Sequence, residues 1–151
     1  MTRTTNARVA GFTFLFYIVV AFPAIVLMNR ATSGEGTAGK LARVAEHASD
    51  VRVAILLTLM SCFAAVVLAV TLYGITRDED HELAVMVLAC RLGEGVLGAI
   101  GIPNTLALLW LATTGSGPGA PDVATANALG TFLLMPAQST MIGAPFSPWG
   151  A

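Results

Sequence analysis

The sequence predicts an all-α integral membrane helical bundle that forms a single domain over residues 1–151. The chain is 56% hydrophobic and only 11% charged, whereas ordinary soluble domains are about 25% charged. Its mean hydropathy is +0.77. Three apolar runs, at residues 11–28, 53–73 and 83–112, approach or exceed the roughly 20 residues that a helix needs to cross a bilayer. A chain this short has no room to bury three such runs in a soluble core, so we expect three transmembrane helices.

The first run, residues 11–28, holds eighteen residues without a charge. Pro23 lies inside it, which membrane helices tolerate because neighbouring groups satisfy the freed backbone. A cleaved signal peptide is the alternative, with Arg3 and Arg8 as its basic region. The long apolar run and the lack of a small-x-small cleavage pattern after Met28 favour a spanning helix.

Residues 29–50 connect the first two apolar runs, and their sequence predicts a short amphipathic helix. The stretch ATSGEG at residues 31–36 is typical of a turn, and Thr37 is placed to cap a helix after it. Weakly apolar residues then recur at i, i+3, i+4 and i+7: Leu41, Val44, Ala45 and Ala48. This pattern favours a helix at the bilayer surface or across the end of the bundle.

The second run, residues 53–73, is uncharged throughout and carries a stripe of small, weakly polar residues. At 100° per residue the stripe comprises Thr58, Ser61, Cys62, Ala65 and Ala69. Such a stripe predicts a helix–helix contact surface, with Ser61 and Cys62 as packing residues. Cys62 and Cys90 both lie in apolar runs, so we expect two small buried side chains rather than a disulfide.

Residues 77–82, RDEDHE, connect the second and third runs. Carboxylates around His81 resemble a set of metal ligands. The simpler interpretation is a solvated turn whose acids favour the start of the next helix. We adopt the second interpretation and predict neither a metal nor another cofactor.

The third run, residues 83–112, contains a candidate intramembrane polar site. Arg91 and Glu94 are three residues apart, so they share one helical face. Charges inside a membrane are costly, and we expect this pair to be enclosed by protein rather than exposed to lipid. Asn104 is the third member, either satisfying backbone groups freed by Pro103 or marking the outer end of the helix.

The length of this third run and its glycines also carry information. As one helix it would reach about 45 Å, against a hydrocarbon core of about 30 Å, so it tilts, bends at Pro103 or begins among the headgroups. Gly95, Gly98 and Gly101 lie near the charged face. We predict that these glycines allow close helix packing.

A fourth and weaker candidate span covers residues 123–144, after the loop GSGPGAPD. Polar residues dilute it and Pro136 interrupts it. We expect a fourth helix packed against the others, and whether it crosses the membrane is left open.

The stretches ARVAGFTFLFYIVV, LYGITR and CRLGEGVLG, with Asp50–Arg52 before the second helix, resemble a known family. It is the bacterial integral membrane family called domain-of-unknown-function family 4386, and the resemblance covers about the first 112 residues. It implies an all-helical membrane bundle with no established reaction, and a cytoplasmic N-terminus. Family members usually continue into further apolar helices and carry an acidic residue midway along the second helix. Ser61 and Cys62 stand there instead.

Arg91 and Glu94 support two functional hypotheses. The first is a small membrane protein without enzymatic activity that acts by helix association, as a homo-oligomer or with a membrane partner. The second is small-solute or proton-coupled transport or sensing at these two residues. An enzyme is not expected, because neither His47 nor His81 has a nucleophile at a recognisable spacing. Nucleic-acid binding is not expected either, because no basic patch with aromatic residues occurs. The predicted location is the bacterial inner or plasma membrane, as a multi-pass protein.

Overall fold

A computed structural model describes residues 3–114 and 121–138 of the chain, with side chains described to residue 135. Throughout this described part the regular structure is α-helical, which confirms the all-α prediction. There are five helices: α1 (Arg3–Ala31), α2 (Gly36–Glu46), α3 (Ala48–Thr76), α4 (His81–Thr113) and α5 (Val123–Gln138).

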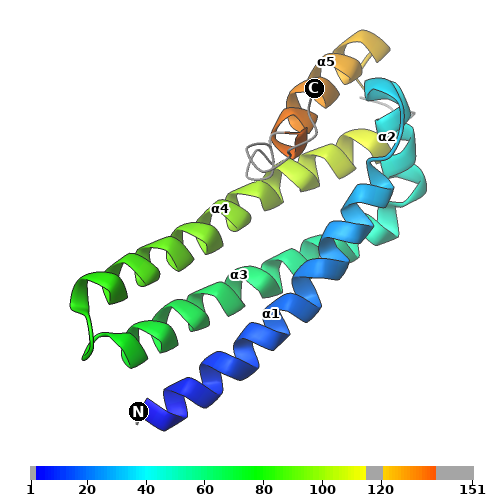
Figure 1. Cartoon of the computed structure of the whole chain (residues 1–151). Helices are drawn as coiled ribbons and strands as arrows, with labels where there is room; N and C mark the ends of the chain where they lie inside the picture. Colours follow the sequence, from blue (N-terminus) through cyan, green and yellow to red (C-terminus); the bar gives the residue numbers. More distant parts are fainter. Residues whose placement is uncertain (1–2, 115–120, 139–151) are drawn as a thin grey trace, which may run out of the picture.

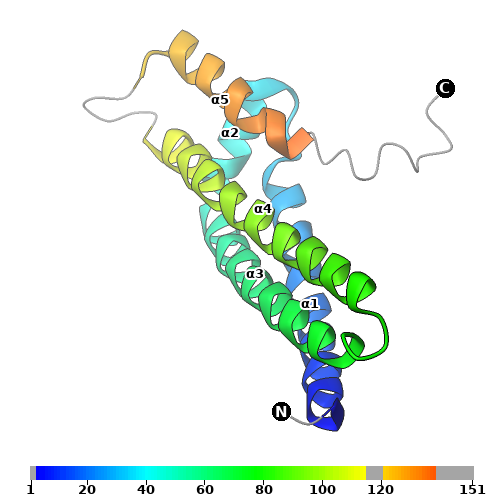
Figure 2. The same ribbon diagram turned by 90° about the vertical axis from the view of Figure 1, so that its left-hand side faces the viewer.

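The three long helices lie side by side, with α3 between α1 and α4 (Figures 1 and 2). Both outer helices pack along α3, yet no Cα atom of α1 comes within 8 Å of one in α4. The N-terminus lies at one end of this layer, and α2 and α5 gather at the other end (Figure 1). The layer therefore has an open side between α1 and α4.

All three long helices are long and apolar enough to cross a membrane, which confirms the predicted spans. Their outer faces carry large apolar side chains, such as Phe12, Phe63 and Leu97, which are 74%, 65% and 71% exposed. A bilayer suits such a surface, because lipid tails are as apolar as these side chains. The helices extend beyond the apolar runs, to 29, 29 and 33 residues.

The acidic connection between α3 and α4 forms a solvated turn and a helix cap. Asp80 is the N-cap of α4, and its carboxylate accepts a hydrogen bond from the backbone N–H of Leu83 at 3.0 Å. Glu79 pairs with Arg3 at the start of α1 at 2.8 Å. His81 places its ring edge against Tyr73, with the ring centroids 6.5 Å apart.

The predicted amphipathic helix is present as α2, with small differences in its buried face. Val44 is fully buried and Leu41 is half-buried against the neighbouring core. Ala45 is exposed, and Ala48 is the first residue of α3. The apolar stripe of α2 is thus narrower than its periodicity predicted, because the helix ends at Glu46.

The predicted capping role of Thr37 is wrong. Helix α2 already begins at Gly36, whose φ of +66° favours glycine, and its N-cap is Glu35. Thr37 therefore lies inside the first turn. Its hydroxyl is 2.9 Å from the hydroxyl of Thr131, so it joins α2 to α5.

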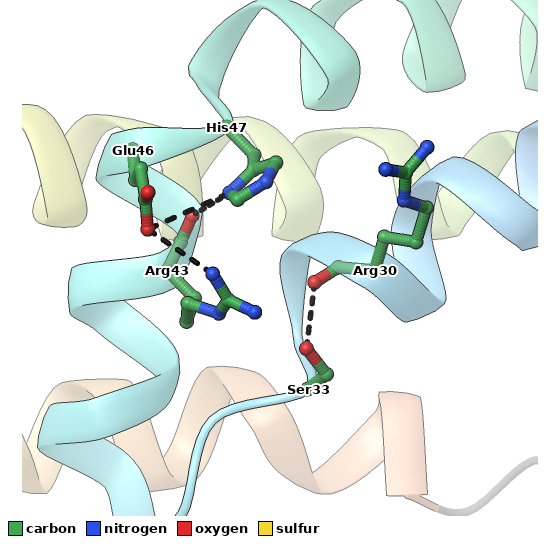
Figure 3. A network of polar contacts seen from close by, with 5 residues as sticks. All are labelled: Arg30, Ser33, Arg43, Glu46 and His47. Carbon is green, nitrogen blue, oxygen red and sulfur yellow. Dashed lines mark hydrogen bonds and ion pairs between the residues drawn. The ribbon is translucent and has the colours of Figure 1, made fainter.

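A small polar network fixes the junctions at this end of the bundle (Figure 3). The carboxylate of Glu46 lies between Arg43, at 3.3 Å, and the ring of His47, at 3.9 Å. Nδ1 of His47 is 3.1 Å from the carbonyl oxygen of Arg43. The hydroxyl of Ser33 donates to the carbonyl of Arg30 where α1 ends. The contacts of Glu46 and His47 thus lie where α2 passes into α3, and the contact of Ser33 lies where α1 ends.

The apolar core lies where α2 and α5 cover the ends of the long helices. Its buried members are Ala31, Val44, Val51, Leu108, Leu109 and Leu134, one or two from each helix. Gly130 allows α5 to approach α2 closely, because a Cβ there would be 2.9 Å from Leu41 and Thr37. This end core closes one end of the open side between α1 and α4.

The predicted fourth helix is present as α5, and its 16 residues give about 24 Å at 1.5 Å per residue. That is shorter than a hydrocarbon core of about 30 Å. Residues 139–144 of the predicted segment lie outside the described residues, so a fourth span stays a prediction.

Candidate functional site

The three long helices meet halfway along their lengths. Tyr17 is the middle residue of α1, and Cys62 is the middle residue of α3. Gly95 and Gly98, near the middle of α4, face Cys62: a Cβ would lie 3.3 Å from the Cys62 carbonyl oxygen at Gly95 and 2.9 Å from Sγ at Gly98. Any larger residue at positions 95 and 98 would push α4 away from α3. The two glycines therefore permit the close approach of the helices.

Arg91 and Glu94 form an ion pair at this level, with 2.7 Å between Nη1 and Oε2. The hydroxyl of Tyr17 donates to the other carboxylate oxygen of Glu94. We call Tyr17, Arg91 and Glu94 the polar triad. It joins α1 to α4 across α3, although the two outer backbones do not touch.

The polar triad borders a groove of about 310 Å³ between α1 and α4, with α3 as its floor. Its walls are mainly apolar or small. The hydroxyls of Thr58 and Ser61 donate to their own helix, to the carbonyls of Ala54 and Leu57 at 2.8 and 3.0 Å. The strong polar groups of the groove are therefore those of Tyr17 and Glu94, with Arg91 beside them.

The charged pair is less enclosed than the sequence predicted. The side chain of Arg91 is 29% exposed and that of Glu94 is 40% exposed. The reason is the layered arrangement: α4 has α3 on one side, and at this level α1 reaches it through the side chain of Tyr17. The described part of one chain thus leaves the pair open on one side.

Asn104 does not belong to the polar triad. It lies ten residues beyond Glu94, about 15 Å along the helix. Its side-chain amide donates to the carbonyl oxygen of Leu133 in α5 at 2.8 Å. The first role predicted for Asn104 is wrong because its amide binds a carbonyl in another helix, and the second is wrong because α4 continues to Thr113.

The other predicted packing residues differ in their surroundings. A Cβ at Gly101 would have no atom within 4 Å, so this glycine packs against nothing in the described part of the chain. Cys62 is half-buried as expected of a packing residue, whereas Cys90 is exposed and was wrongly predicted to be buried.

Sequence analysis missed Tyr17. Tyrosine normally favours the membrane interface, and Tyr17 stands at the centre of the first apolar run. A tyrosine hydroxyl at that depth needs a hydrogen-bond partner. Its position in the apolar run was therefore a signal in the sequence that Tyr17 contacts a polar group.

No curated protein and no solved structure matches the chain. The model of the family described as a domain of unknown function (DUF4386) matches residues 9–147. This match covers most of the chain and extends beyond the first 112 residues that suggested the resemblance. The protein therefore belongs to the DUF4386 family.

Proposed function

We propose that the protein acts by association within the membrane, without a catalytic role. A helix of another subunit, either a second copy or a partner, would seat on the open side of the groove and cover the polar triad. The observation that carries this proposal is the exposure of the charged pair halfway along the helices. The side chain of Arg91 is 29% exposed and that of Glu94 is 40% exposed.

The physical reason lies in the cost of charge at the centre of a bilayer. Placing an Arg or Asp at the centre of a membrane helix costs about 2.5–3.5 kcal/mol on insertion scales. Pairing within the chain reduces that cost, but the exposed remainder of each side chain would still face lipid. A second helix would replace that lipid, and the small residues along the groove would let it approach closely.

The shape of the groove supports association over transport through one chain. The groove opens sideways, and a smaller pocket of about 120 Å³ continues from it toward α2, sharing Met28, Thr58 and Gly98 with it. Beyond this pocket lies the packed end core. A pathway would need a second opening. The association hypothesis requires only that the open side be covered.

The experiment is the mass of the purified protein in detergent and in lipid nanodiscs, for four variants. These are the wild type, Arg91→Leu, Glu94→Leu and the double variant, which has no unpaired charge. We expect the wild type to form a defined oligomer and each single variant to lose assembly. The double variant should fold and assemble better than either single variant. The second helix would bury the pair, and removing one partner of a buried pair typically costs about 3–5 kcal/mol.

The matched control removes the exposed pair Arg77 and Asp78, whose atoms are 3.5 Å apart in the solvated turn. Their replacement by Leu should leave the mass unchanged, because exposed pairs contribute about 0–1 kcal/mol. A wild-type monomer in both environments would refute the association proposal.

Proton-coupled transport or sensing is the second candidate, and the contact between Tyr17 and Glu94 favours it. A phenol and a carboxylate can exchange a proton, and these two groups are in direct contact in the groove. Under this hypothesis the double variant of Arg91 and Glu94 assembles like the wild type. It then fails to carry protons into vesicles that contain a pH-sensitive dye.

We further propose the bacterial inner or plasma membrane as the location, with the N-terminus in the cytoplasm. Basic residues near the helix ends are almost balanced between the two sides, with three at the N-terminal end and four at the α2 end. Reporter fusions at residue 1 test the orientation, and an external signal would reverse it.

A further inference from the structure

We propose that α5 is a half-inserted helix whose outer face lies against the lipid acyl chains of the leaflet on the α2 side. This inference does not depend on the proposed association. It concerns a different surface, at the end of the bundle remote from the N-terminus (Figure 2).

The depth of α5 follows from its bond to α4. The middle of the bundle lies where Cys62 meets Gly95 and Gly98. Asn104 is six residues beyond Gly98, which is about 9 Å along α4. Half of the hydrocarbon core is about 15 Å. Asn104, and the Leu133 carbonyl that it holds, therefore lie inside the hydrocarbon.

The length of α5 then sets how far the helix reaches. Val123 is ten residues before Leu133, about 15 Å along α5. From the depth of Leu133 this distance reaches the headgroups of the α2 side. The 16-residue helix carries no charged side chain, so no charge opposes its insertion. The helix thus occupies one leaflet.

The two faces of α5 differ in the way this location requires. Leu134 on the inner face is 3% exposed, and Gly130 packs against α2. On the outer face Leu129 and Phe132 are 44% and 69% exposed. Val123 shares the face of Gly130 and Leu134, but it is 79% exposed because it is the first residue of the helix. Within residues 3–114 and 121–135 these side chains lie at the surface, where acyl chains would contact them.

The same bond also satisfies the polar side chain of Asn104. Inside a bilayer a side-chain amide must find its partner within the protein. The amide of Asn104 donates to the carbonyl of Leu133 at 2.8 Å. A side chain of α4 thus supplies a donor where water is absent.

The test is the depth of spin labels in phosphatidylcholine–phosphatidylglycerol vesicles, read from collisions with oxygen and with a water-soluble nickel chelate. Labels are placed by Phe132→Cys and Val123→Cys in the full chain after both native cysteines are changed to Ala. Ile18, next to Tyr17, provides the midplane reference, and Glu82 in the first turn of α4 provides the surface reference.

We expect the oxygen-to-nickel collision ratio to rise in the order Glu82, Val123, Phe132, Ile18, with the ratio at Phe132 several-fold above that at Glu82. If the Phe132 variant does not fold, Leu129→Cys replaces it. A label at Phe132 as accessible to nickel as Glu82 would place α5 in water and overturn the proposal. Exclusion of both reagents would show that protein covers this face, and would overturn it equally.

Discussion

Replacing Gly98 with Ala would test the close packing of α4 on α3. The added Cβ would lie 2.9 Å from Sγ of Cys62, whereas uncompressed contacts lie at about 3.5–4.0 Å. Overpacking of this kind costs about 1–3 kcal/mol. Gly101→Ala is the matched control, because a Cβ there meets no atom within 4 Å.

Both substitutions gain similar helix propensity, about 1 kcal/mol for Gly to Ala, so their difference isolates the contact with Cys62. We expect Gly98→Ala to be less stable than Gly101→Ala by about 1–3 kcal/mol. The free energy of unfolding would be measured in mixed micelles from the loss of helical circular dichroism.

Cys62→Ala provides the decisive second step, because it removes the Sγ that the new methyl group would meet. In that background the difference between Gly98→Ala and Gly101→Ala should fall to about 0.5 kcal/mol or less, the usual error of additivity. Equal stabilities of the two single variants, or a difference that persists without Sγ, would refute the packing geometry.

Three further changes test other contacts. Tyr17→Phe removes one intramembrane hydrogen bond and should lower stability by about 0.6–1.7 kcal/mol in the same micelle unfolding assay. The hydroxyl of Tyr73 has no partner in the described structure, so Tyr73→Phe should leave the stability unchanged. Asn104→Leu should weaken the docking of α5, so hydrogen exchange in α5 should be faster than in the wild type while exchange in α3 stays the same. Unchanged exchange in α5 would contradict the contact. Asp80→Ala should cost about 0.5–2 kcal/mol as a lost N-cap, whereas Asp78→Ala should cost less than about 1 kcal/mol.

The sequence was sufficient to predict the three spans, because long apolar runs are a strong and local signal. It was also sufficient to predict that Arg91 and Glu94 share a face, because helical geometry fixes the positions of residues three apart. The structure adds that they form an ion pair. Both predictions depend on neighbours along the chain.

Contacts between helices could not be predicted in the same way. Tyr17 and Glu94 are 77 residues apart, and their meeting depends on the order in which the helices pack. Asn104 was assigned to its own helix because no periodicity in the sequence indicates that α5 lies beside it. The open side of the groove also depends on that packing order. Helical periodicity in the sequence therefore could not predict the exposure of Arg91.

The central position of α3 has a consequence for how the chain assembles during synthesis. Helices α3 and α4 are joined by a four-residue connection, so their hairpin closes at little entropic cost once both are made. Helix α1 is made first, yet its main packing surface is α3, which is separated from it by the whole of α2. A nascent α1 therefore waits alone in the membrane until α3 emerges, and the contact between Tyr17 and Glu94 can form only after α4 follows.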